Sequence, residues 1–352
     1  MMPTSASRFF CANDTHNKHH RAYSWRELTV TEMYRSIKGV VFYQRGFIFV
    51  AALSVACWYL LLRFQPETNR SPGVLAWWAA MCAVSFVNIW MWRLSATAIA
   101  ARKDMVEPAT YRFQRWQLLL SAAYVFGCAF RSILPRADVQ RFGLIDSWAS
   151  SVLVGRSVAT VAELCFVAQW ALLLNVIAKD SNSRFGVVVS WLLVPLIVFA
   201  ECCSWYGVLT TAYIGNAIEE STWALSALLL IVSFIVLWSR CKAAFRPFVA
   251  ASLVLGTAYF IFMCSVDIPM YVSRWLEDEA NGREYLSLSQ GLWDVGSRWI
   301  VTHSWDEWHP EIPWMSLYFS VGVWFSLALV HIPWFERNEP QTVQLRPIPP
   351  AA

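Results

Sequence analysis

Several ionisable residues lie inside long apolar segments of this sequence, where a charged side chain is costly unless it is paired or faces water. Arg156, Thr160 and Glu163 are spaced so that all three share one face of a helix. Such groups are candidates for ion pairing, proton binding or catalysis. Further ionisable residues in or beside apolar segments include Arg131, Glu201, Glu219, Glu220 and Asp267.

A second set of polar residues lies in a long segment near the C-terminus, 271–312, which is rich in acidic residues and tryptophan. It contains two histidines, His303 and His309. Carboxylates and imidazoles are common ligands of divalent metals. Glu163, Asp267, His303 and His309 are therefore a candidate metal site, although the spacing of the histidines matches no recognised metal motif.

The first functional hypothesis is a membrane-embedded hydrolase or transferase that acts on a lipid or a lipid-linked substrate, with a divalent metal as its candidate cofactor. A carboxylate in a low-dielectric site can perform acid–base chemistry, and arginines bind anionic headgroups. The predicted catalytic residues are Glu163, Asp267 and His303. The predicted substrate-binding residues are Arg131, Arg156, Glu201 and Trp305.

Two other hypotheses stay open. In a proton- or ion-coupled secondary transporter, Arg156 and Glu163 would form part of the coupling site. In a non-catalytic scaffold, the same residues would be structural ion pairs that hold helices together. Acidic residues at a helix N-terminus, such as Glu219 and Glu220, are also favoured by the helix dipole without any further function.

The elements that position these residues are membrane helices. Of the 352 residues, 57% are hydrophobic and 15% are charged, whereas soluble domains have about 25% charged residues. The net charge of +4 is small and the basic residues form no patch, which argues against nucleic-acid binding. The expected partner is membrane lipid, and the composition does not say which cellular membrane holds the chain.

Apolar segments of about 20 residues predict eight spans in an all-α transmembrane bundle. The predicted spans are 46–64, 73–93, 116–134, 149–178, 185–211, 217–239, 247–271 and 313–334. If the N-terminus is cytoplasmic, the inner segments hold 18 Lys and Arg residues and the outer side holds 7, with Arg63 at the end of the first span counted among the 7. Because cytoplasmic loops are enriched in these residues, we expect both termini in the cytoplasm.

This topology divides the chain into a polar N-terminal segment (1–45), a transmembrane bundle (46–334) and a proline-rich tail (335–352). It also places the ionisable groups named above in the outer half of the membrane. We therefore expect a polar cavity that opens to the outer side. The tryptophan-rich segment 271–312 is expected to pack over it as a cap.

Overall fold

The computed structural model describes residues 71–104, 106–240 and 246–332. The predicted first span at 46–64, the N-terminal segment 1–45 and the tail 335–352 lie outside the described residues.

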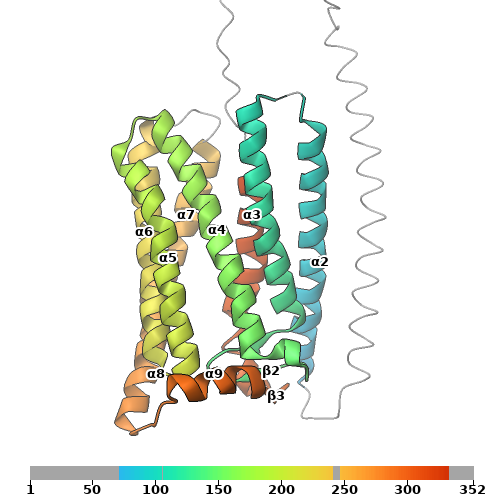
Figure 1. Cartoon of the computed structure of the whole chain (residues 1–352), viewed down its shortest axis with the longest axis vertical. Coiled ribbons are helices and arrows are strands. Elements are labelled where there is room, and N and C mark those ends of the chain that lie inside the picture. Colours follow the sequence, from blue (N-terminus) through green and yellow to red (C-terminus); the bar gives the residue numbers. More distant parts are fainter. Residues whose placement is uncertain (1–70, 105, 241–245, 333–352) are drawn as a thin grey trace, which may run out of the picture. The chain divides into compact units, whose positions relative to one another are not determined.

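The described part of the chain is mostly helical (Figure 1). Its α-helices are α2 (Pro72–Ala101), α3 (Pro108–Ile133), α4 (Val152–Asp180), α5 (Arg184–Thr210), α6 (Tyr213–Leu237), α7 (Arg246–Phe262), α8 (Ile268–Ala280), α9 (Leu288–Ser297), α10 (Trp305–Trp308), α11 (Ile312–Leu317) and α12 (Val323–Val330). Two π-helical turns, η4 (Met263–Asp267) and η5 (Tyr318–Gly322), join α7 to α8 and α11 to α12. The remaining elements are the 3-10 turns η1 (Trp148–Ser150) and η2 (Trp238–Arg240) and the strands β1 (Arg136–Ala137), β2 (Phe142–Gly143) and β3 (Ile300–Val301).

Among the described residues, six helical segments are long and apolar enough to cross a membrane, so this chain is an α-helical membrane protein. They are Pro72–Ala101, Val152–Asp180, Arg184–Thr210, Tyr213–Arg240, Arg246–Ala280 and Ile312–Val330. Large apolar side chains on these helices are exposed, as lipid-facing residues are; examples are Val161, Val188, Trp191, Ile235 and Val254.

The predicted number of eight spans and the predicted location of the termini stay predictions. The segment 46–64 is not among the described residues, and α3, which covers the predicted span 116–134, is not among the six apolar segments. That helix carries Arg112, Arg115 and Arg131. It nevertheless packs between α2 and α4, as a further member of the same bundle.

One helix boundary differs clearly from the prediction. The span expected to end at residue 271 continues through η4 and α8 to Ala280. Arg274 and Glu277 look like loop residues in the sequence, but a helix extends beyond the hydrocarbon without energetic cost when its end is polar. The guanidinium of Arg274 also lies over the rings of Tyr213 and Tyr271, at 5.6 and 6.0 Å from their centroids.

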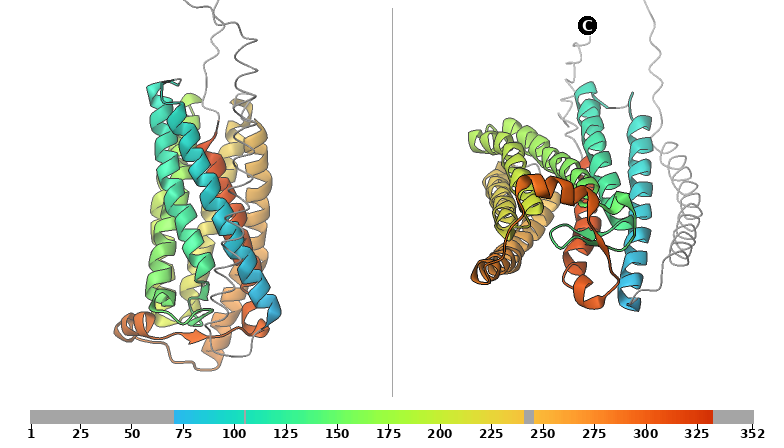
Figure 2. Two further views of the ribbon diagram at one scale, coloured as in Figure 1. Left: turned by 90° about the vertical axis from the view of Figure 1, so that its right-hand side faces the viewer. Right: turned by 60° about the horizontal axis from the view of Figure 1, so that its bottom comes forward.

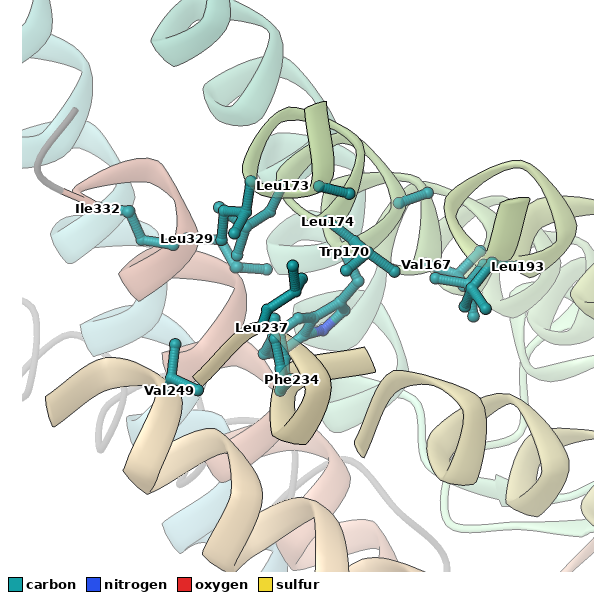
Figure 3. Close-up of a cluster of buried hydrophobic side chains, with 14 of the residues drawn as sticks. Val167, Trp170, Leu173, Leu174, Leu193, Phe234, Leu237, Val249, Leu329 and Ile332 are labelled. Atoms are coloured by element: carbon teal, nitrogen blue, oxygen red, sulfur yellow. The ribbon is translucent and has the colours of Figure 1, made fainter. Parts of the chain in front are cut away.

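Consecutive helices from α2 to α7 contact one another, and α12 packs against α2, α3 and α4. A buried apolar cluster joins the later part of α4 to α5, α6, α7 and α12 (Figure 3). At its centre the Trp170 ring contacts the rings of Phe234, Phe248 and Phe325. This end of the bundle is held together mainly by apolar packing.

The other end of the bundle is termed the loop end. The segments that connect α3 to α4 and α5 to α6 meet there with the segment that follows α8. In the small sheet, β2 pairs antiparallel with β1 and parallel with β3. Backbone hydrogen bonds run from Ser71 N to His303 O and from Leu286 N to Thr210 O, both at 3.1 Å. The segment that follows α8 therefore packs on the ends of the long helices.

Helix α9 lies across the ends of α4 and α5 (Figure 2). Its Gly291 is essential for this approach, because a Cβ atom there would lie 2.1 Å from the carbonyl oxygen of Leu209. A capping box on Ser287 and Gln290 begins the helix. The opposite face of α9 exposes Trp293, which is 78% accessible.

Candidate functional site

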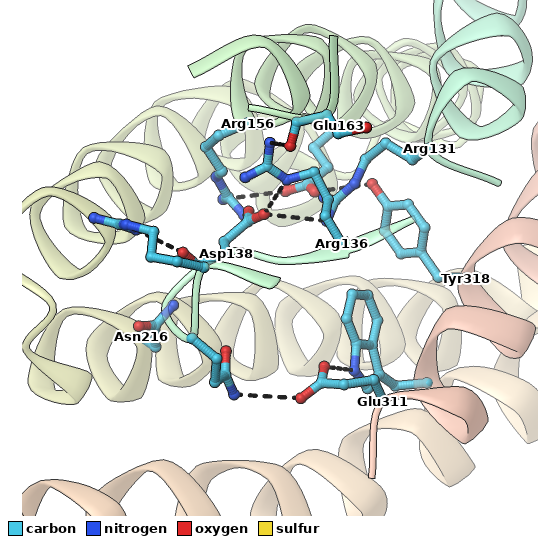
Figure 4. Close-up of polar contacts among 12 residues, drawn as sticks. Arg131, Arg136, Asp138, Arg156, Glu163, Asn216, Glu311 and Tyr318 are labelled. Atoms are coloured by element: carbon cyan, nitrogen blue, oxygen red, sulfur yellow. Dashed lines mark hydrogen bonds and ion pairs between the residues drawn. The ribbon is translucent and has the colours of Figure 1, made fainter. Parts of the chain in front are cut away.

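The guanidinium of Arg156 is the centre of a buried polar cluster at the loop end of the bundle (Figure 4). Its Nη2 atom lies 2.5 Å from Glu219 Oε1, 3.1 Å from Glu201 Oε2 and 3.8 Å from Glu163 Oε2. All four side chains are less than 10% accessible. Helices α4, α5 and α6 thus each contribute a glutamate to one cation.

The early part of α4 places Arg156 and Glu163 two helical turns apart on one face. The helix begins at Ser151, whose hydroxyl accepts a hydrogen bond from Val154 N at 3.4 Å. Gly155 provides room beside this face, because a Cβ atom there would lie 2.5 Å from Arg136 Cδ. The glycine therefore allows a second arginine to approach the cluster.

Asp138, in the loop between β1 and β2, extends the cluster to three arginines. Its carboxylate lies 2.9 Å from Arg136 Nε, 3.6 Å from Arg131 Nη2 and 3.9 Å from Arg156 Nη1. Burial alone would raise the pKa of Asp138, but the three guanidinium groups lower that pKa to about 2. Asp138 is therefore ionised at neutral pH, and its ion pairs hold the β1–β2 loop against α3 and α4.

Burial lowers the pKa of Arg136 to about 10, and the nearby Asp138 opposes this effect. Arg136 still carries its proton at neutral pH, and its Nη1 donates a hydrogen bond to Ser150 O at 3.0 Å. It is thus a fixed positive charge beside the buried acids.

Each of the three glutamates also accepts a hydrogen bond from a neutral side chain. These donors fix the carboxyl planes and replace part of the lost hydration. The donors are Tyr318 Oη to Glu163 at 2.9 Å, Thr160 Oγ1 to Glu201 at 2.6 Å and Asn216 Nδ2 to Glu219 at 3.2 Å.

The cluster contains more acid than base. Four carboxyl groups, those of Asp138, Glu163, Glu201 and Glu219, share three guanidinium groups. The three glutamates offer oxygen atoms that all lie within 4.8 Å of one another, so the carboxyl groups of Glu163 and Glu201 are close neighbours. Glu201 Oε1 is buried and accepts no hydrogen bond from another described group when all four acids are ionised.

Such an arrangement can bind one proton between Glu163 and Glu201. A net negative charge in a buried site is unfavourable, and like charges at this range cannot all stay ionised. One bound proton would leave three ionised carboxylates opposite three guanidinium groups. It would also supply the hydrogen bond that Glu201 Oε1 lacks. The cluster is therefore suited chemically to take up and release a proton.

The structure brings together five of the ionisable residues singled out in the sequence: Arg131, Arg156, Glu163, Glu201 and Glu219. Asp267, at the end of η4, is close enough to Glu219 for their charges to interact but is not part of the three-glutamate group.

The histidines and Trp305 lie elsewhere. His303 Nε2 is 3.1 Å from Leu144 O, and His309 Nδ1 is 3.1 Å from Trp305 O, with the two rings stacked. Trp305 is 49% accessible. In the described chain, the predicted metal set of Glu163, Asp267, His303 and His309 does not converge. Moreover, Arg156 Nη2 occupies the position among the three glutamates that a metal ion would take.

Sequence reasoning missed the roles of Asp138, Arg136 and Tyr318. The first two lie in the connection between α3 and α4, outside the apolar segments, where charged residues carry no energetic signal, although the pattern Arg136-Ala137-Asp138 places opposite charges close together. Tyr318 looks like an interfacial aromatic residue. Its location on the π-helical turn η5 could not be predicted from the sequence.

Comparison of the chain with known protein families, with curated proteins and with solved structures finds no match.

Proposed function

We propose that this protein is a proton-coupled membrane transporter, in which the Glu163–Glu201 pair binds the coupling proton beside Arg156. The observation that carries the proposal is the excess of one carboxyl group over the guanidinium groups in a buried cluster where the long apolar helices meet the α3–α4 connection. One bound proton makes the charges of the cluster equal. Its release would leave a net negative charge in the buried cluster, which favours a different arrangement of the helices.

A chain of buried polar side chains continues from the cluster toward the other end of the bundle. Gln169, which is about 9 Å further along α4 than Glu163, bonds with α3 and α12. Its Nε2 donates to Gln117 O at 3.1 Å and its Oε1 accepts from Ser326 Oγ at 2.6 Å, and the Ser121 and Ser326 hydroxyl oxygens lie 3.0 Å apart. Gln117 Oε1 has no hydrogen-bond partner in the described chain. These groups offer a route along which water and a proton could pass when the helices move.

The two π-helical turns also support a moving site. The first ends at Asp267, near Glu219, and the second begins at Tyr318, whose hydroxyl bonds to Glu163. Such turns occur often at functional sites because they interrupt regular helix hydrogen bonding. Both lie in segments that are apolar enough to cross a membrane.

The membrane-embedded hydrolase or transferase receives less support. His303 and His309 would complete its metal site, and both lie apart from the glutamates. The scaffold hypothesis accounts for the ion pairs but not for the surplus carboxyl group. A structural cluster would be more stable if its charges balanced.

The test uses purified protein in proteoliposomes and records the charge displaced by a pH jump. We expect a transient current in the wild type that is lost in Glu163→Gln and in Glu201→Gln. The matched control is Glu277→Gln, which removes an exposed carboxylate on α8 and should leave the current unchanged.

Coupling is then tested by adding glucose, alanine, succinate or phosphate and following the internal pH with an enclosed dye. At least one solute should drive internal acidification that depends on Glu163. Gln169→Leu should slow it without removing the initial proton binding. A pH-jump current that is the same in all variants, or one that no solute converts into acidification, would contradict the proposal. Release of headgroup from lipid that requires Glu163 would instead restore the enzyme hypothesis.

A further inference from the structure

A cavity of about 270 Å³ lies at the loop end, outside the buried cluster. Three arginines and two acidic residues line it, so its charge is positive overall; they are Arg141, Arg283, Arg298, Glu284 and Asp294. The lining also contains Tyr213, the first residue of α6. The N-terminus of this helix adds a partial positive charge to the same wall.

The three arginines differ in what they can bind. Arg141 is 3% accessible and each of its three guanidinium nitrogens already donates a hydrogen bond, to Asp294 Oδ2 at 2.7 Å and to the carbonyl oxygens of Asp138 and Val208, both at 2.6 Å. It therefore positions the wall of the cavity. It also connects the cavity to the cluster, because it bonds to the backbone of Asp138.

Arg283 and Arg298 keep most of their donors free. Arg283 is 38% accessible, bonds through Nη1 to Asp278 Oδ2 at 2.6 Å, and lies over the Tyr213 ring. Arg298 is 64% accessible and has one weak contact of 3.4 Å with Asp294 Oδ1. A guanidinium has five donor groups, and arginine pairs favour planar, two-oxygen anions. These two side chains come from different segments and face one cavity.

The backbone of the cavity wall is held in an unusual conformation. Among the described residues, three non-glycine residues have positive φ, and two of them, Arg141 (φ 60°) and Thr211 (φ 62°), line this cavity. This conformation is unfavourable for a β-branched residue such as Thr211. Backbone strain of this kind is often retained at ligand sites.

We propose that this cavity is a binding site for a small anion that carries a carboxylate or phosphate group, with Arg283 and Arg298 as its ligands and Arg141 as the positioning residue. The site stands on its own geometry, and its further role as the place where a transported anion first binds rests on the proposed function. Arg141 provides the physical link, since an anion drawn toward it would also act on the loop that holds Asp138.

The test is isothermal titration calorimetry of the detergent-purified full-length protein with succinate and with inorganic phosphate. We expect saturable binding that is weakened about tenfold in Arg283→Gln and in Arg298→Gln, because each loses a charge-assisted hydrogen bond. Arg240→Gln, an exposed arginine at the opposite end of the bundle, is the matched control and should bind normally. Both altered side chains are partly exposed, so the variants should unfold at the wild-type temperature.

Two further measurements separate the source of the anion and the two proposals. Binding to phosphatidylglycerol vesicles, compared with phosphatidylcholine vesicles, tests a lipid headgroup; loss of the preference in the two arginine variants would assign the site to lipid phosphate. Glu163→Gln should still bind the anion, so failure of transport leaves this proposal intact. The inference is overturned if neither soluble anion binds and the vesicle preference is the same in all variants, or if binding is unchanged in both arginine variants.

Discussion

Replacement of Arg156 by glutamine is the most informative test of the buried cluster. It removes the cation that three glutamates contact at 2.5, 3.1 and 3.8 Å and that also lies 3.9 Å from Asp138. The excess of acid over base in the cluster then rises from one group to two. Removing one partner of a buried ion pair costs about 3–5 kcal/mol. We expect a loss of this size in the free energy of unfolding.

The same charge count predicts a rescue. Glu219 has the shortest contact with Arg156, so the double variant Arg156→Gln/Glu219→Gln returns the excess to one group. It should be less destabilised than the sum of the two single variants, by about 1–3 kcal/mol. Thermal or denaturant unfolding in one detergent, followed by size-exclusion chromatography, measures both effects.

The control is Arg112→Gln, which removes an exposed arginine from α3 and should change stability by no more than about 0.5 kcal/mol. If Arg156→Gln were as stable as this control, the cluster would not be a coupled charge network. Additive losses in the double variant would lead to the same conclusion.

Three other variants test separate contacts. Gly155→Ala should displace Arg136 from Asp138 and destabilise the protein by about 1–3 kcal/mol, whereas Gly296→Ala, whose Cβ would meet only Leu153 at 3.7 Å, should not; unfolding temperatures compare them. Asp138→Asn should lower the free energy of unfolding by about 2.5 kcal/mol at neutral pH. Because the native pKa of Asp138 is depressed to about 2, this stabilisation is present above about pH 4 and is lost as the pH falls toward 2, so the unfolding curves of wild type and variant should converge there. Tyr318→Phe removes a donor to Glu163 and should cost about 1.5 kcal/mol, while Tyr285→Phe, an accessible hydroxyl on Glu279, should cost little in the same denaturant titration.

The sequence was sufficient to predict the helical membrane fold and part of the site. Long apolar segments leave a chain few alternatives to membrane helices. An ionisable residue inside such a segment must find a partner, which is why Arg131, Arg156, Glu163 and Glu201 could be selected before their contacts were known. The structure brings these four residues into one cluster.

The remainder depends on how loops fold back, which local sequence patterns do not encode. Asp138 pairs with three arginines only because the β1–β2 loop turns onto α3 and α4. His303 and His309 were expected beside the carboxylates, but the chain after β3 turns toward Leu144 and Trp305. The polar end of α8 was predicted as a loop, because hydropathy indicates which residues lie in lipid and does not indicate where a helix ends.

Infrared difference spectroscopy of the protonation state tests the central claim most directly. At neutral pH the wild type should show the absorption of a protonated carboxyl group in a dry environment. Glu163→Gln and Glu201→Gln should each weaken it, because either change leaves three acids with three arginines in the cluster, and Glu277→Gln should leave it unchanged. If the spectra of the wild type and of both cluster variants superimposed, the buried pair would hold no proton and the account of a proton-coupled site would be contradicted.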